Sequence, residues 1–104
     1  MNEAAIYKAL GDPVRLEIVA RLARQSPRTL GELSEDLGIS RQGARKQIEV
    51  LASARVVQLV PSGRVTEVSL DTRTLETARQ FIAMLEQQWD QRLAALQKFV
   101  EDND

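Results

Sequence analysis

The last third of this 104-residue chain has the pattern of one uninterrupted amphipathic helix. Between residues 72 and 100 apolar side chains recur every three or four positions, with no glycine or proline among them. They are Leu75, Ala78, Ile82, Leu85, Trp89, Leu93, Leu96 and Val100. Such a helix is about 42 Å long, and the core of so small a domain cannot cover its apolar side. We therefore expect a second surface, most simply another copy of the chain, to cover it.

Two shorter helices are expected at the N-terminal end. An amphipathic segment over residues 3–10 is followed by Gly11, which ends it. Asp12 then has the character of an N-cap, with Pro13 in the first helical position, where its missing N–H costs nothing. An apolar stripe of period 3.6 carries this second helix to Arg24.

The middle of the chain has the pattern of a helix-turn-helix. Thr29 and Glu32 form a capping-box pair that opens a short helix over residues 30–37. Gly38 suits the turn that follows, and a further helix is predicted over residues 41–53. Two helices joined by a tight turn with a glycine are typical of DNA-binding helix-turn-helix units.

A β-hairpin follows this helix pair directly. Residues 56–60 form a short segment rich in β-branched side chains, and Pro61 to Gly63 predict a turn. Polar and apolar side chains alternate along residues 64–70. The predicted fold is therefore mainly α with a small β-hairpin: a winged helix-turn-helix with a long C-terminal dimerisation helix.

The domain organisation expected from this pattern is simple. Residues 1–104 form a single winged-helix domain, in which residues 13–70 are the DNA-binding core. Residues 1–10 and 72–100 are the dimerisation helices, and the polar tail 101–104 frays.

Composition excludes several classes of function. The chain has no cysteine and no histidine, which removes disulfides, thiolate or imidazole metal sites and the common nucleophile–base pairs of enzymes. No apolar run is long enough to span a membrane, and the N-terminus lacks the basic segment of a secretion signal. We expect a cytoplasmic protein that is not an enzyme and needs no metal, cofactor or membrane.

The charge distribution favours DNA as a partner. The whole chain has a net charge of −1, but residues 41–73 carry six basic and three acidic side chains. Arginine and glutamine, which predominate at the start of helix 41–53, are suited to base edges in the major groove. The predicted DNA-binding residues are Thr29, Ser40, Arg41, Gln42, Arg45, Lys46 and, on the wing, Arg64.

Each of these residues also has a structural explanation. A charged helix face is often only solvated surface, Ser40 and Thr29 are helix caps whether or not they touch a phosphate, and Arg64 stands in a turn. Gly43, uncommon in the first turn of a helix, either permits close approach to DNA or is a tolerated surface choice.

The apolar residues of the two terminal helices are predicted to form the dimer interface. They are Ile6, Leu10, Ile82, Leu85, Trp89, Leu93 and Leu96. Trp89 and Phe81 could instead line an effector pocket at this interface, but their near-heptad placement favours packing.

Several stretches together resemble the ArsR family of winged-helix repressors. The run LGDPVRLEI, from Leu10 to Ile18, resembles that family's opening L-x-D-P-T-R-L-x-I. The segment from Thr29 to Gln42 is similar to its x-V-x-E-L-A…L-x-L-S-Q stretch, and the segment from Ile48 to Val57 to its H-L-x-x-L-x-x-A-G-L-V. The wing ends in Val68-Ser69-Leu70, like the family's Y-x-L, so the resemblance covers about residues 8–71.

The resemblance implies a homodimeric repressor that reads an inverted repeat in double-stranded DNA through helix 41–53. Metal-sensing members carry cysteines where this chain has Ser34 and Asp36, so it resembles the metal-independent members. Gln47 and Gly43 also depart from the usual recognition helix, where Gln47 replaces a histidine. The alternative is a winged-helix interaction module that pairs with another protein through its C-terminal helix. The operator, the regulated genes and any small-molecule effector are not encoded in these patterns.

Overall fold

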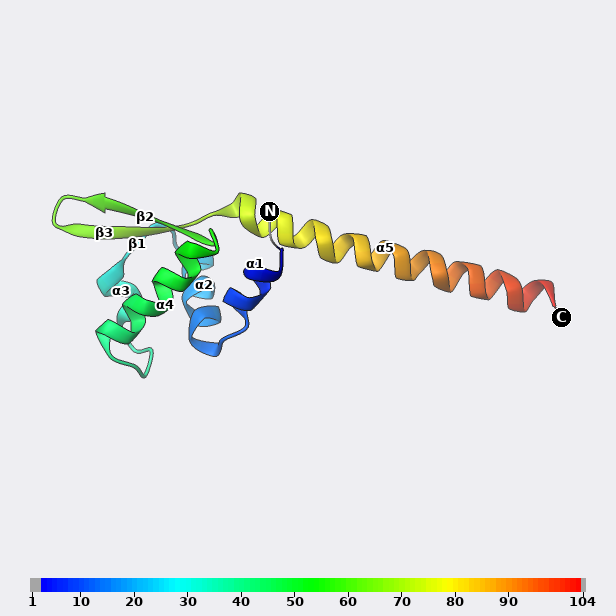
Figure 1. Cartoon of the computed structure of the whole chain (residues 1–104), viewed down its shortest axis with the longest axis horizontal. Helices are drawn as coiled ribbons and strands as arrows, with labels where there is room; N and C mark the ends of the chain where they lie inside the picture. Colours follow the sequence, from blue (N-terminus) through cyan, green and yellow to red (C-terminus); the bar gives the residue numbers. More distant parts are fainter. Residues whose placement is uncertain (1–2, 104) are drawn as a thin grey trace.

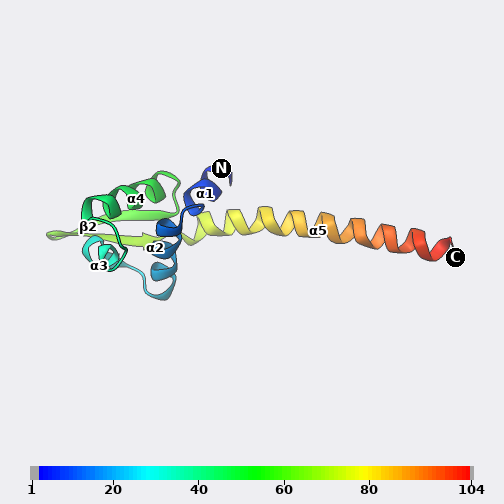
Figure 2. The same ribbon diagram turned by 90° about the horizontal axis from the view of Figure 1, so that it is seen from below.

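The computed structural model describes residues 3–103 and has the predicted architecture, a small winged body with a long helix leaving it (Figures 1 and 2). Residues 1–2 of the predicted first helix segment and residue 104 of the predicted frayed tail lie outside the described part. The elements in order are α1 (Glu3–Leu10), α2 (Pro13–Arg24), β1 (Arg28–Thr29), α3 (Leu30–Ser34), α4 (Arg41–Ser53), β2 (Val57–Ser62), β3 (Val65–Leu70) and α5 (Thr72–Asp102).

Four helices begin at side-chain caps. The Asp12 carboxylate accepts from the backbone N–H groups of Val14 and Arg15 at 2.9 and 3.1 Å. Thr29 and Glu32 form the complete capping box at the start of α3, while Ser40 caps α4 and Asp71 caps α5. Because each cap satisfies otherwise unpaired N–H groups, the starts of these helices are fixed locally.

Helix α3 is shorter than predicted, since it ends at Ser34 and not at Leu37. The guanidinium of Arg21, on α2, donates to the backbone oxygens of Leu33, Glu35 and Asp36. These are carbonyls that a helix end leaves without partners. Because α3 ends early, the turn before α4 spans six residues, 35–40. Within this turn Asp36 has a positive φ of 55°.

The sheet has three strands rather than the two of a plain hairpin. The pair Arg28–Thr29 forms β1 and lies antiparallel to β3, giving the order β1-β3-β2. Pro61 and Ser62 belong to β2 and not to the predicted turn, which is reduced to Gly63 and Arg64. Strand β2 is an edge strand, where a proline is tolerated because a missing donor breaks no interior ladder.

The core forms where α1, α2, α3, α4 and the base of the hairpin meet. Its fully buried side chains include apolar residues of α2, α3 and α4: Ile18, Leu22, Leu33, Ala44, Ile48 and Leu51. Ile6 also belongs to this core, at 1% exposure. Its predicted place in a dimer interface is therefore wrong, because its own protomer already covers it.

Helix α5 extends far beyond the body (Figure 1). The molecule measures 70 × 25 × 22 Å, and only Thr74 and Ala78 of this helix are buried. Contacts with α1 fix its first part: the Tyr7 hydroxyl donates to the Ala78 carbonyl at 2.6 Å, and the Tyr7 ring lies against Phe81. The helix runs to Asp102, into the polar tail 101–104. Among residues 3–103, no helix has the length and apolar character needed to cross a bilayer.

Candidate nucleic-acid interface

Helix α4 has one buried and one exposed side. Ala44, Ile48 and Leu51 are fully buried and anchor the helix to the body. The opposite side exposes the side chains that were predicted to meet DNA: Arg41, Gln42, Arg45 and Lys46. The helix is therefore held firmly by its apolar side, while its polar side stays open to a partner.

A cleft of about 440 Å³ lies between α3, α4 and the wing. It brings together five of the seven predicted DNA-binding residues, namely Thr29, Arg41, Gln42, Arg45 and Arg64. These residues come from three separate elements, so only the folded chain places them side by side. Ser40 and Lys46 do not line the cleft, although both are exposed, Ser40 as the N-cap of α4 and Lys46 on that helix.

The cleft is positively charged. Its described lining contains three arginines, Arg41, Arg45 and Arg64, and no acidic side chain. Of these three, only Arg45 forms an ion pair within residues 3–103, with Glu49 one turn later at 3.3 Å. This pair is exposed and therefore weak, so the arginine can exchange it for a phosphate or a base edge.

Further polar groups line the cleft that sequence reasoning did not select. Thr66 on β3, with Gly31 and Ser34 on α3, stands among the arginines. The Ser34 hydroxyl donates to the Leu30 carbonyl at 2.7 Å, so its oxygen remains able to accept. Thr66 could have been found from the alternation of polar residues along the hairpin, but the α3 residues depend on how that helix docks.

The two hydroxyl caps are already engaged within the chain. The Ser40 oxygen accepts from the Gly43 N–H at 3.0 Å, and the Thr29 oxygen accepts from the Glu32 N–H at 3.1 Å. In return the Glu32 carboxylate accepts from the Thr29 N–H at 2.9 Å, and this bond holds the pKa of Glu32 below its usual range. Each hydroxyl still has a proton to donate to a phosphate oxygen.

The structure gives a third explanation for the glycine at position 43, besides close approach to DNA and a tolerated surface choice. A Cβ atom on Gly43 would lie 3.2 Å from the Ser40 oxygen and 3.6 Å from Ile39. The vacant position therefore faces the N-cap of α4 and the preceding turn. The glycine leaves room for the capping hydroxyl at the end of the helix that meets the cleft.

A hydrogen-bond network joins α4 to α1. The guanidinium of Arg15, on α2, donates to the side-chain oxygen of Gln47 at 2.7 Å. It also donates to the backbone oxygens of Ala9 and Lys8 at 2.6 and 3.2 Å, at the end of α1. The side-chain oxygen of Gln47 thus anchors α4 to the body through Arg15.

The second surface is the exposed apolar side of α5. Of the predicted interface residues, Ile82, Leu85, Trp89, Leu93 and Leu96 are between 45% and 60% exposed. Phe99 and Val100 continue the same surface, whereas Leu10 is partly covered by the core. An apolar surface of this length, on the part of α5 that extends beyond the body, marks a site of association.

Comparison with known proteins shows the family of this chain. Residues 10–60 match the model of a family described as a helix-turn-helix domain. The HTH-type transcriptional regulator Rv2034 of Mycobacterium tuberculosis is 38% identical over 73 residues, which cover 70% of this chain and 67% of that protein. An ArsR-like transcriptional regulator from Rhodococcus sp. RHA1 superposes with a TM-score of 0.81 at 28% identity, over 93% of this chain and 91% of the other.

A second solved structure has the same fold at lower identity. It is the homodimeric winged helix-turn-helix DNA-binding domain Mb0332 from Mycobacterium bovis, with a TM-score of 0.64 and 20% identity. The similarity covers 80% of this chain and 77% of that domain.

Proposed function

This chain belongs to the ArsR family of winged helix-turn-helix transcriptional regulators, and from that premise we propose that it is a homodimeric repressor of an inverted-repeat operator. The observation that carries the proposal is the cleft between α3, α4 and the wing, with its three arginines and no acidic side chain. A small domain of nearly neutral net charge that concentrates cations in one place has an electrostatic footprint for a polyanion.

The proposed docking follows from the elements that bear each side chain. Helix α4 enters the major groove with its N-terminal residues first, so that Arg41, Gln42 and Arg45 reach base edges. Lys46 and the hydroxyl caps contact phosphates, and Arg64 at the tip of the wing meets the minor groove or its backbone. The cytoplasm, where such a regulator meets its operator, is the compartment proposed for it.

The exposed side of α5 supports the proposal of a homodimer. A second copy of the chain carries the same apolar surface on its own α5. In a dimer with two-fold symmetry, these two identical surfaces can pack against each other. The Mycobacterium bovis domain with the same fold is a homodimer. A dimer would also set two α4 helices apart by about one turn of DNA, which is what an inverted repeat needs.

The experiment that tests this function is fluorescence anisotropy with DNA from upstream of the protein's own gene and with a scrambled duplex. We expect tighter binding to the upstream DNA, with a log–log salt slope of about −0.9 for each phosphate neutralised. Arg45→Ala/Lys46→Ala should abolish the preference and flatten the slope.

The matched control is Arg24→Ala/Arg79→Ala, which removes two positive charges outside the cleft and should bind nearly as the wild type does. If both double variants bound DNA equally, the loss of affinity would come from the change in net charge and not from the position of the charges. Absence of binding to either duplex at low salt would contradict the proposal. It would favour the alternative of an interaction module, to be tested by pairing α5 with another protein.

A further inference from the structure

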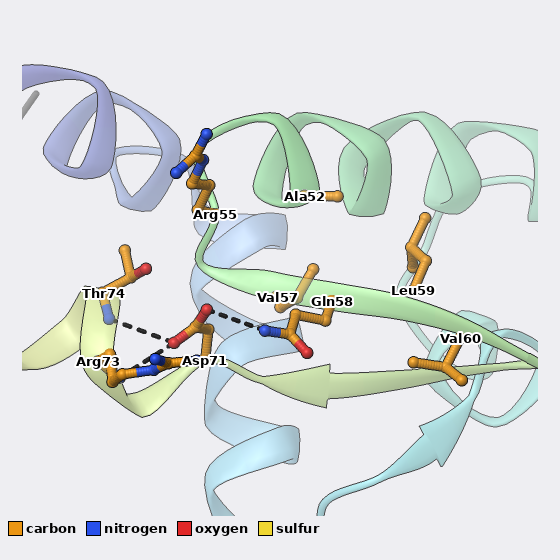
Figure 3. A pocket seen from close by; sticks show the side chains of 9 residues that line it. All are labelled: Ala52, Arg55, Val57, Gln58, Leu59, Val60, Asp71, Arg73 and Thr74. Carbon is orange, nitrogen blue, oxygen red and sulfur yellow. Dashed lines mark hydrogen bonds between the residues drawn. The ribbon is translucent and has the colours of Figure 1, made fainter. Parts of the chain in front are cut away.

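A second groove, of about 720 Å³, lies on a different part of the molecule from the charged cleft. It runs between the C-terminal end of α4, the edge strand β2 and the start of α5 (Figure 3). None of the predicted DNA-binding residues lines it. Its volume falls in the range of about 300–1,000 Å³ that is usual for small-molecule sites.

The groove has an apolar and a polar end. Ala52 on α4 and Leu59 on β2 face each other across the apolar part, above the buried side chain of Val57 (Figure 3). The polar part contains two arginines, Arg55 and Arg73, and one carboxylate. A ligand that fits both ends must have an apolar body and a charged head.

The one carboxylate, Asp71, is already occupied by the protein. It accepts hydrogen bonds from the side chain of Gln58 at 3.1 Å and from the backbone N–H groups of Arg73 and Thr74 at 3.0 and 3.4 Å. Burial raises the pKa of Asp71, but these bonds outweigh it and hold the pKa below the usual range. Asp71 therefore stays ionised as the cap of α5 and is not free to bind a cation.

Arg55 has the opposite character. Its side chain is exposed and forms no hydrogen bond or ion pair with another residue of the described chain. With Arg73 beside the groove and Asp71 occupied, the lining carries a net charge of +1. The unmatched charge of the polar end therefore calls for an anionic head.

The backbone conformation of Arg55 is one in which a side chain is energetically unfavourable. Arg55 follows the last turn of α4 with a φ of 63°, where its N–H donates to Ala52 at 3.0 Å and the next N–H, of Val56, donates to Leu51 at 2.9 Å. This is a Schellman motif, whose left-handed position usually holds glycine. A side chain there costs about 1 kcal/mol, so a use for the guanidinium would explain its presence.

We propose that this groove binds a small organic carboxylate with an apolar body. The guanidinium of Arg55 would hold the carboxylate through charge-assisted hydrogen bonds, and Arg73 adds positive charge to the lining. The apolar body would lie between α4 and β2, against Ala52 and Leu59. Because the site is separate from the charged cleft, the proposal does not rest on DNA binding.

The test uses octanoate as the probe, with acetate and octanol as controls for the head and the body alone. Amide chemical shifts of the isotope-labelled full chain are followed by NMR during titration. We expect octanoate to shift the amides of Ala52, Leu59 and Thr74, and to bind about tenfold more tightly than either control. Shifts confined to the apolar side of α5, or equal responses to octanoate and octanol, would overturn the proposal.

Arg55→Gly is the decisive variant, because glycine suits the left-handed backbone and the fold is retained. We expect its dissociation constant for octanoate to rise about tenfold, while Arg24→Ala, outside the groove, leaves the constant unchanged. If Arg55 serves only to end α4, Arg55→Gly will bind octanoate as the wild type does. DNA binding measured on the same samples distinguishes loss of this site from failure of the regulator function.

Discussion

Two glycines in the helix-turn-helix give a matched pair for testing how the N-cap of α4 is built. Ordinarily, replacing a helical glycine by alanine stabilises a protein by about 0.5–1 kcal/mol. Gly31→Ala should do so, because the new Cβ would meet only the Thr29 hydroxyl at 3.9 Å. Gly43→Ala should give no gain or a loss, because its Cβ would lie 3.2 Å from the capping oxygen of Ser40.

Urea denaturation of both variants measures this difference. A gain in unfolding free energy for Gly43→Ala equal to that for Gly31→Ala would show that the cap tolerates the methyl group. The glycine in α4 would then need another explanation, such as close approach of DNA.

Glu32 provides a prediction about pH. Its pKa is lowered in the folded chain by the backbone hydrogen bond from Thr29, so its stabilising effect is complete above the pKa of the unfolded chain. That effect is lost as the pH falls through the lowered pKa of the folded chain. Glu32→Gln keeps a neutral acceptor in the capping box, and its own contribution should not change with pH.

Thermal unfolding of both proteins from neutral pH to about pH 3 checks this expectation. The wild type should have the higher midpoint at neutral pH, and the difference should close in acid. Other carboxylates titrate in both proteins and cancel in the comparison. A difference that stays constant with pH would contradict the role given to the charge.

At the scale of elements, the link from α1 through Arg15 to α4 can be tested at Gln47. Gln47→Leu removes the acceptor and leaves a partly buried guanidinium N–H without its partner. We expect it to lower the unfolding free energy by about 1–2 kcal/mol. DNA affinity should fall about fivefold as α4 loses an anchor. Gln47→Glu, which keeps an acceptor for Arg15, should retain the stability of the wild type.

Denaturant unfolding and anisotropy measure these two effects on the same samples. Arg45→Ala is the contrasting variant, because its side chain is exposed and its loss should weaken DNA binding with little change in stability. Wild-type stability in Gln47→Leu would show that the link does not hold α4.

The elements that could be predicted from sequence are those whose limits are set locally. Asp12 with Pro13, and Ser40 before its apolar stripe, fixed the starts of α2 and α4 as the structure has them. Strand β1 escaped prediction because two residues acquire strand character only by pairing with β3. The end of α3 escaped because it depends on Arg21, which comes from another helix.

The residues of the candidate site also fall into two groups, those that could be predicted from sequence and those that depend on tertiary packing. Residue chemistry and position selected Arg41, Gln42 and Arg45, which share one helix face and line the cleft. Thr66 and Ser34 were missed because their places depend on how the wing and α3 dock against α4. Ile6 was misassigned since a period of 3.6 identifies an apolar side but not which body covers it.

At the scale of the whole molecule, the proposed dimer can be tested on α5. Trp89→Glu places a charge in the middle of the exposed apolar side and should convert the dimer to a monomer in sedimentation experiments. Affinity for an inverted repeat should then fall by about a hundredfold or more, because the two half-sites are no longer bound together.

Gln87→Glu adds the same charge about 160° away around the helix and should leave the dimer intact. A Trp89→Glu protein that remains dimeric would move the interface elsewhere. Equal dissociation by both variants would show that the added charge, and not its position, separates the protomers.

The length of α5 also decides how the regulator responds to its own abundance. A body that covers only Thr74 and Ala78 of this helix leaves the rest of its apolar side to the proposed partner copy. Where free monomers prevail, the concentration of dimers follows the square of the monomer concentration, so halving expression lowers operator occupancy about fourfold. A gene controlled in this way would switch at a threshold of regulator dosage, and that threshold could be moved by substitutions on α5 that never touch DNA.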